Sequence, residues 1–200
     1  MGTYGALLTG GVTLVAQAQT LYTIGYGNKT ISDFIFALQT YHIDYLVDVR
    51  TTPASRFNPD FSKARLENFL SRHHIRYVWM GDTLGGLPDD NTCYVQGRVD
   101  YAKVETLDSY QNGIARIKTA WEKEIQLVMM CAEGKPEECH RSKLIGQTLA
   151  RSHVPVAHIE ITGAIVSQEE VIQRLTQKQL SLFGESFMSR KRYVKSGERY

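Results

Sequence analysis

The chain has 200 residues and a formal net charge of +2 at pH 7; 42% of its residues are hydrophobic and 22% are charged. This composition is ordinary for a globular protein with a sizeable core, and so small a net charge points to no class of partner. Its three cysteines are an odd number without the spacing of a disulfide framework, which favours the reducing cytoplasm over secretion. No apolar stretch of the sequence is long enough to span a membrane.

We expect three regions along the chain: a leader at residues 1–20, an α/β domain at 21–165, and a C-terminal helix with a basic tail at 166–200. The leader has no charged side chain, and Ala16-Gln17-Ala18 resembles a signal-peptide cleavage site. A signal peptide also needs a positively charged start and an unbroken apolar stretch, and both are missing. We therefore expect a weakly ordered leader.

Short apolar runs alternate with amphipathic segments from residue 21 onward. The apolar runs predict five strands, at 21–25, 45–49, 75–79, 125–131 and 155–161. The amphipathic segments predict helices that begin after Thr30 or Ser32 and that span 60–72, 110–124, 136–152 and 168–182. Residues 80–103 form a long turn-rich insertion, typical of lids and binding loops. The alternation predicts the α/β class: a single domain with a mostly parallel, about five-stranded sheet flanked by helices.

The fourth predicted strand leads into the most informative segment of the chain. Cys131 ends this strand, and Glu133 lies in the Gly/Pro loop that follows. Cys139, His140 and Arg141 then open the next helix. In open α/β sheets, ligands bind at the carboxyl ends of the strands. Helix N-termini at that edge present free N–H groups and the positive end of the helix dipole, which favour anions, so we expect a site here.

Three interpretations of Cys131 and Cys139 are open. Cys139 is a candidate nucleophile, because a helix N-terminus with nearby His and Arg side chains lowers a thiol pKa, although Glu137 and Glu138 oppose that effect. His140 is then a candidate acid–base group or anion ligand. A metal site is disfavoured because Cys139 and His140 are adjacent and no C-x-x-C pair exists, so we expect neither a metal nor another cofactor. Alternatively, both cysteines are small hydrophobic residues of the core.

A second polar group follows the second predicted strand. Arg50 and Arg56 leave the carboxyl end of that strand, at the same edge as the cysteine segment if the two strands are parallel. Because arginine forms a planar fork of donors that matches phosphate or carboxylate, we expect Arg50, Arg56 and Arg141 to converge on one anion. Tyr26, just past the first strand, is expected to complete this anion site by stacking on a base or sugar. The alternative is that Arg50 pairs with Asp48 and braces the loop, and that Tyr26 only packs.

Four motifs occur in order along the chain. They are Thr23-Ile24-Gly25-Tyr26-Gly27-Asn28, Asp48-Val49-Arg50 with Pro53 and Ser55-Arg56, Leu84-Gly85-Gly86, and Cys131-x-Glu133-x-x-Pro136-x-x-Cys139-His140-Arg141. This series resembles the domain-of-unknown-function family 488, over residues 21–165. The resemblance implies a compact α/β domain with these motifs gathered at one edge. It implies no reaction, because the chemistry of that family is unassigned.

Near the C-terminus, the pentapeptide Gln-Leu-Ser-Leu-Phe at 179–183 resembles the short peptide by which many bacterial DNA polymerases and repair proteins bind the sliding clamp. In that peptide the Gln anchors by hydrogen bonds, and the Leu and Leu-Phe side chains fill apolar pockets. The candidate contacts are therefore Gln179, Leu180, Leu182 and Phe183. The alternative is that the pentapeptide ends the amphipathic helix predicted at 168–182.

Together these features predict a cytoplasmic protein that binds or processes nucleic acid, nucleotides or another phosphorylated ligand at an anion-binding crevice, in a role such as DNA repair. The predicted catalytic residues are Cys139, His140, Cys131 and Glu133. The basic and aromatic tail at 187–193 suits a nucleic-acid partner, and we expect no membrane partner. Two alternatives stay open: a thiol-dependent small-molecule enzyme with rhodanese-like sulfur transfer, and a non-catalytic adaptor for DNA and the clamp.

Overall fold

The structure, a computed structural model, describes residues 19–178 and 187–193. Within these residues the main sheet has six strands in the order β3-β2-β6-β1-β7-β8, and only the β7–β8 pair is antiparallel. The strands are β1 (Leu21–Gly25), β2 (Tyr45–Asp48), β3 (Arg76–Trp79), β6 (Leu127–Cys131), β7 (Val156–Ile159) and β8 (Ile165–Ser167). The predicted α/β class with a mostly parallel sheet is confirmed.

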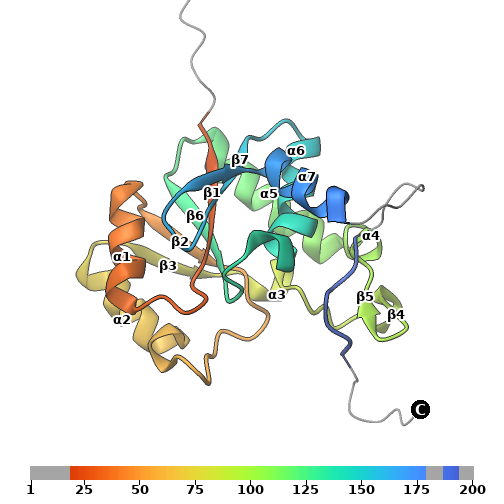
Figure 1. Cartoon of the computed structure of the whole chain (residues 1–200), viewed down its shortest axis with the longest axis horizontal. Coiled ribbons are helices and arrows are strands. Elements are labelled where there is room, and N and C mark those ends of the chain that lie inside the picture. Colours follow the sequence, from red (N-terminus) through yellow and green to blue (C-terminus); the bar gives the residue numbers. More distant parts are fainter. Residues whose placement is uncertain (1–18, 179–186, 194–200) are drawn as a thin grey trace, which may run out of the picture.

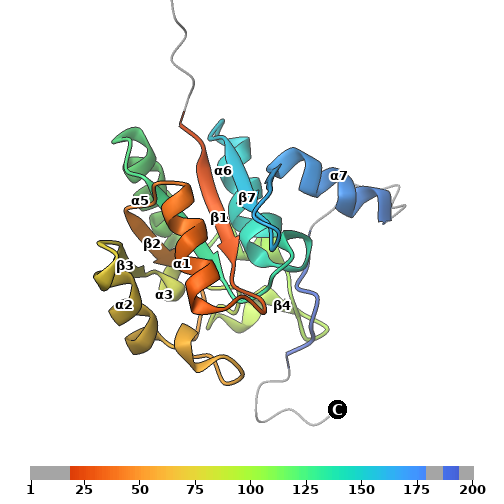
Figure 2. The ribbon, with the colours of Figure 1, turned by 60° about the vertical axis from the view of Figure 1, so that its left-hand side comes forward.

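Helices cover both faces of the sheet (Figures 1 and 2). The helices α1 (Ile31–Thr40) and α2 (Lys63–Arg72) bury Phe34, Leu38, Leu66 and Leu70 in one core. The core on the other face contains buried residues of α5 (Asp108–Glu122) and α6 (Gln147–Arg151). The first helix begins as expected, because the Thr30 hydroxyl caps it by accepting from the main-chain N–H of Asp33.

The alternation of side chains along β6 sets the side of the sheet on which Cys131 lies. Val128 and Met130 belong to the core under α1 and α2, whereas Leu127, Met129 and Cys131 belong to the core under α5. All five residues are buried, as expected for a strand covered on both faces. Cys131 therefore faces the helical layer that follows β6 in the chain.

The long insertion is more ordered than its sequence indicates. It contains the short helices α3 (Gly81–Leu84) and α4 (Tyr101–Val104) and a hairpin of β4 (Tyr94–Val95) and β5 (Arg98–Val99). Residues 187–193, which we name the C-terminal segment, lie along this hairpin. The main chains of Ser189 and Val99 are hydrogen-bonded, and the N–H of Tyr193 donates to the carbonyl of Gly97 over 2.7 Å.

The helix predicted at 136–152 is wrong as a continuous element. A 3₁₀ turn spans Pro136–Glu138, Cys139 is extended, a π-helical turn spans Arg141–Gly146, and α6 completes the segment. The hydrogen bonds fit the wide turn, because the Ser142 carbonyl accepts both from the N–H of Gln147, five residues on, and from the side chain of Gln168. Such π-helical turns occur often at functional sites.

Two further differences concern the end of the domain. The strand β8 was not predicted. It has only three residues and lies at the antiparallel edge of the sheet, so it leaves no apolar run in the sequence. The helix α7 (Gln168–Lys178) packs back on the domain through the buried Val171. The remainder of the helix predicted at 168–182, like most of the predicted leader at 1–20, lies outside the described residues.

None of the helices in the described ranges is both long and apolar enough to cross a membrane.

Candidate functional site

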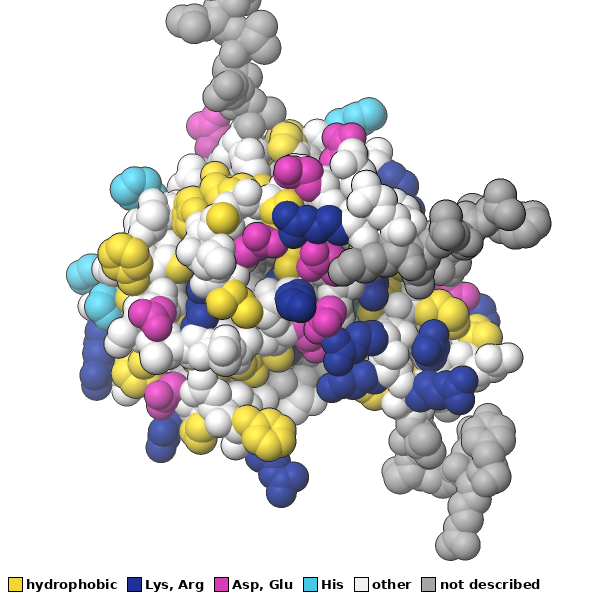
Figure 3. All heavy atoms as spheres, in the orientation of Figure 1, with side chains coloured by type: hydrophobic (Ala, Val, Ile, Leu, Met, Phe, Trp, Pro, Cys, Tyr) yellow, Lys and Arg dark blue, Asp and Glu magenta, His cyan; other side chains and the backbone are white. Residues whose placement is uncertain are grey.

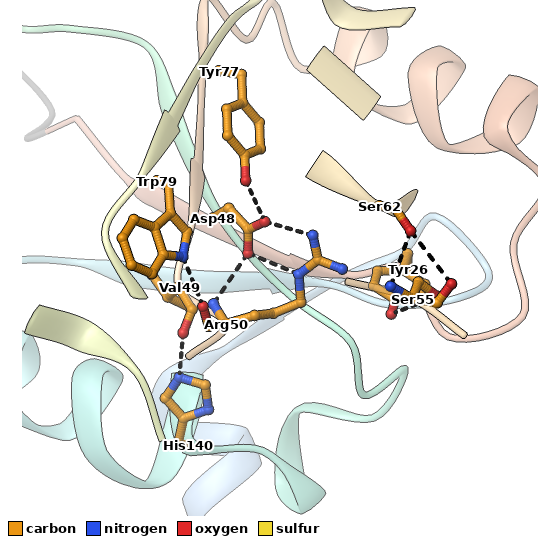
Figure 4. A network of polar contacts seen from close by, with 9 residues as sticks. All are labelled: Tyr26, Asp48, Val49, Arg50, Ser55, Ser62, Tyr77, Trp79 and His140. Carbon is orange, nitrogen blue, oxygen red and sulfur yellow. Dashed lines mark hydrogen bonds and ion pairs between the residues drawn. The ribbon is translucent and has the colours of Figure 1, made fainter. Parts of the chain in front are cut away.

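Two neighbouring strands, β2 and β6, bring the candidate residues to one edge of the sheet. Asp48 is paired with Met130 in their parallel register, so the chain leaves both strands at the same level. His140 reaches this edge from the segment after β6, and its Nε2 lies 3.1 Å from the carbonyl oxygen of Val49 (Figure 4). The arginine motif and the cysteine motif therefore lie side by side at the carboxyl edge.

Cys131, Glu133, Cys139 and His140 lie together, because Glu133 and His140 each contact both sulfur atoms, and we name the four residues the Cys–His–Glu cluster. Oε2 of Glu133 lies 2.9 Å from Sγ of Cys131 and 3.4 Å from Sγ of Cys139. Nδ1 of His140 lies 3.7 Å from each of the two sulfur atoms. The fold thus assembles all four residues for which the sequence predicts a catalytic role.

The surroundings of the two thiols shift their pKa values in opposite directions. Burial raises the pKa of the Cys139 thiol, but the hydrogen bond with Cys131 and the charges of Arg141 and His140 outweigh it and hold this pKa well below its ordinary value. The hydrogen bond with Cys139, together with burial, raises the pKa of the Cys131 thiol well above its ordinary value. Burial lowers the pKa of His140, yet its contact with Cys139 outweighs burial and raises this pKa overall.

The cluster opens into a pocket with a volume of about 270 Å³. Cys131, Glu133 and His140 line this pocket, but Cys139 does not. The other walls come from the loop after β2, from the insertion and from the C-terminal segment. A ligand in the pocket therefore meets one thiol, the imidazole and the carboxylate of the cluster.

The three predicted anion-binding arginines do not converge. Arg141 is fully buried, and its guanidinium donates to the main-chain carbonyls of Glu133 and Gly134. Its side chain holds the loop after β6 in place and does not line the pocket. Arg56 is exposed and also lies outside the pocket lining. The sequence predicts that Arg141 lies in the first turn of a helix and faces the anion. In the structure a 3₁₀ turn precedes this residue instead, and the Arg141 side chain lies under the loop.

Arg50 follows the alternative interpretation of the sequence. Its guanidinium forms a buried ion pair with Asp48, and the hydroxyl of Tyr77 donates to the same carboxylate over 2.7 Å (Figure 4). Arg50 still contributes to the pocket lining. Tyr26 lies under the Arg50 guanidinium, 5.4 Å from ring centre to Cζ, and stacks on Phe61. Tyr26 is therefore a packing residue and is not among the residues that line the pocket.

Several residues that line the pocket were not among the predicted site residues. Tyr101 comes from the insertion, and Arg190, Lys191 and Tyr193 come from the C-terminal segment. Gly86 lies against the His140 ring, where a Cβ atom would be 2.9 Å from ring atoms. Its place in the Leu84-Gly85-Gly86 motif was the only available signal, and the basic, aromatic composition of 187–193 was the signal for the segment.

A family model described as "Domain of unknown function DUF488" matches residues 30–147. This chain belongs to the DUF488 family. The matched range includes the Cys–His–Glu cluster, Arg50 and Gly86, whereas the C-terminal segment lies beyond it. The family description names no reaction. Searches of curated proteins and of solved structures gave no significant match.

Proposed function

We propose that this DUF488 protein binds a phosphorylated ligand of the nucleotide or nucleic-acid class in the pocket and acts on it with the Cys–His–Glu cluster. The observation that carries the proposal is the composition of the pocket. Cationic side chains of Arg50, Arg190 and Lys191 line the same cavity as the thiol of Cys131 and the imidazole of His140. Reactive side chains and groups that attract an anion therefore share one space of ligand size.

The positive charge extends beyond the pocket. Arg190 is paired with Glu138, whereas Lys191 and Arg192 are exposed, and Lys143 interacts electrostatically with both Arg190 and Arg98. In Figure 3, dark blue side chains gather on the side of this face where β4 and β5 lie in Figure 1. A surface of this kind attracts the phosphate groups of a nucleotide or a nucleic-acid strand.

Aromatic side chains favour a nucleotide over a simple phosphate ester. Tyr101 and Tyr193 both line the pocket, beside the basic residues of the C-terminal segment. A tyrosine ring stacks on a nucleobase, while lysine and arginine neutralise the phosphate. In the proposed function, these tyrosine and basic side chains take the place of the three-arginine anion site that the sequence predicts.

Sulfur transfer of the rhodanese type receives less support from the geometry. Such a reaction needs a thiolate that the substrate can reach. The thiol with the lowered pKa, that of Cys139, does not line the pocket, and the lining thiol, that of Cys131, has a raised pKa. In the proposed function, the four residues of the cluster therefore act together.

A test of the proposed function is ligand binding measured by calorimetry and by fluorescence anisotropy. The ligands are inorganic phosphate, ATP and a labelled single-stranded oligonucleotide. The double variant Arg190→Ala/Lys191→Ala should bind ATP or the oligonucleotide at least ~10-fold more weakly, and binding should weaken as salt concentration rises. The double variant Arg116→Ala/Lys123→Ala removes the same charge away from the pocket lining and serves as the control. Equal losses in both variants, or no binding of any ligand, would contradict the proposal.

A role at replicated or repaired DNA is the finer part of the proposed function. Its support is the pentapeptide at 179–183, which lies outside the described residues. Only residues 184–186 separate the pentapeptide from the C-terminal segment that lines the pocket. Clamp binding would therefore hold the pocket close to DNA.

A further inference from the structure

The ligand atoms of Cys131, Cys139 and His140 are spaced like the corners of a metal-coordination tetrahedron. The two Sγ atoms and one nitrogen all lie within 4.8 Å of one another. A tetrahedral Zn²⁺ ion with ordinary bond lengths keeps a sulfur and a nitrogen ligand about 3.6 Å apart. The corresponding distances here, from Nδ1 of His140 to each sulfur, are both 3.7 Å.

The orientation of His140 is that of a metal ligand. A carbonyl oxygen only accepts hydrogen bonds, so Nε2 of His140 carries the hydrogen that is donated to Val49. In a neutral imidazole this leaves the lone pair on Nδ1, which faces the two sulfur atoms. Histidines that bind metals commonly donate their other ring N–H to a carbonyl or carboxylate, which fixes the ring and its tautomer. The close contact of the ring with Gly86 further limits its rotation.

Although Cys139 and His140 are adjacent in sequence, the backbone allows both side chains to face one metal ion. Cys139 has extended backbone angles of φ −119° and ψ 148°, whereas His140 has helical angles at the start of the next turn. This change of conformation lets both side chains face Cys131. Cys131 itself is the last residue of β6.

Glu133 lies beside the two sulfur atoms of the group. Its Oε2 lies 2.9 Å and 3.4 Å from the two sulfur atoms, and Glu133 also lines the pocket. Two thiols, an imidazole and a carboxylate form a donor set suited to Zn²⁺, whereas Mg²⁺ and Ca²⁺ prefer oxygen ligands alone.

We propose that the Cys–His–Glu cluster is a zinc site, in which Sγ of Cys131, Sγ of Cys139 and Nδ1 of His140 bind the ion. The fourth position is left for a water molecule or a pocket ligand, with the Glu133 carboxylate beside the two sulfur atoms. The main-chain N–H of Arg141 donates to Sγ of Cys139 over 3.4 Å and would support this sulfur as a thiolate. This inference goes beyond the proposed function and does not depend on which ligand the pocket accepts.

The test is metal binding by the full chain, first stripped of metal with a chelator. Co²⁺ reports the ligands spectroscopically, because each thiolate bound to cobalt adds charge-transfer absorption in the near ultraviolet. We expect one Co²⁺ per chain with absorption from two thiolates, and displacement of Co²⁺ by Zn²⁺. Cys131→Ser and Cys139→Ser should each lose about half of this absorption. Cys93→Ser is the matched control, because Cys93 is a buried thiol outside the cluster, and it should retain all of it.

Two further variants keep the test decisive if a serine variant fails to fold. His140→Gln should lower Zn²⁺ affinity at least ~10-fold, and Glu133→Gln should retain both thiolate absorptions while altering the cobalt d–d bands. The absence of charge-transfer absorption in the wild-type chain, or an equal loss in Cys93→Ser, would overturn the zinc site. Arg190→Ala/Lys191→Ala should bind metal like the wild type, so failure of the zinc site and failure of the proposed ligand are distinguishable.

Discussion

Gly86 and His140 are packed so closely that a methyl group on residue 86 would lie 2.9 Å from both Cγ and Nδ1 of the imidazole. Gly86 has no positive φ, so its backbone conformation is open to alanine. We therefore predict that Gly86→Ala disturbs His140 and little else. Displacement of the ring should weaken metal binding about 10–100-fold, as changes around metal ligands commonly do, and this is measured by Zn²⁺ titration.

The double variant Gly86→Ala/His140→Ala provides the control for this prediction. With the imidazole removed, the added methyl group has no ring to displace, so the two effects should not add. Additive losses in the double variant would show that Gly86 acts independently of His140.

The buried ion pair between Asp48 and Arg50 predicts a large effect on stability. Asp48→Asn leaves the Arg50 guanidinium buried without its counter-charge, because Arg50 is only 5% exposed and Asp48 is fully buried. Removal of one partner of such a pair costs about 3–5 kcal/mol in the free energy of unfolding. Urea denaturation of the variant and the wild type measures this difference.

Asp60→Asn is the matched control, since the Asp60–Arg65 pair is largely exposed. The loss of an exposed pair should change the unfolding free energy by at most about 1 kcal/mol. Similar losses in both variants would mean that burial of the Asp48–Arg50 pair contributes little.

The sequence was sufficient to predict the parallel core of the fold. The runs that became β2 and β6 are apolar at nearly every position, as expected when helices cover both faces of a sheet. The hairpin of β4 and β5 was missed because strands of two residues leave no periodicity. The π-helical turn was missed because the contact that fits it, that of Gln168 with the Ser142 carbonyl, joins residues far apart in sequence.

The candidate site was predictable in part for a similar reason. The parallel direction of β2 and β6 is enough to place Cys131 and Arg50 at the same edge of the sheet. The direction of a long side chain depends on local turns, and the arginines were misplaced on this account: Arg141 lies under the loop and Arg56 is outside the pocket lining. Lys191 could not be placed from sequence, because its position follows from pairing of the C-terminal segment with the hairpin.

His158 predicts a dependence of stability on pH. Burial and the nearby charge of Arg141 lower the pKa of His158 to about 4, whereas its ordinary value is 6.5. The unfolded chain therefore binds a proton in this pH range that the folded protein excludes. The stability contributed by the neutral His158 is fully present above about pH 6.5 and falls as the pH drops toward 4, by ~3 kcal/mol. Denaturation curves at pH 7 and pH 4.5 measure most of this change.

The control for pH dependence is His158→Gln. The neutral imidazole contacts Thr23 and Gln168, and glutamine retains hydrogen-bonding groups without titrating. The variant should lose about 3 kcal/mol less than the wild type on acidification. An identical pH dependence in both proteins would assign the effect to other groups.

The pentapeptide at 179–183 predicts binding to a bacterial sliding clamp. Leu182 and Phe183 should be the main apolar anchors, because a few buried side chains dominate the energy of most interfaces. Leu182→Ala/Phe183→Ala should abolish clamp binding in calorimetry and leave ATP binding in the pocket unchanged. A wild-type chain that shows no clamp binding would exclude this partner.

The pairing of the C-terminal segment with the hairpin places one basic wall of the pocket on a short piece of chain that protein engineering can exchange. The reactive side chains lie within the range matched by the DUF488 family, whereas Arg190, Lys191 and Tyr193 lie after it. Replacement of residues 187–193 by another sequence that keeps the backbone pairing to Val99 and Gly97 would therefore exchange the wall that meets the ligand while retaining the thiols and the imidazole. Under the proposed function, such a graft should change which ligand the pocket selects without altering the Cys–His–Glu cluster.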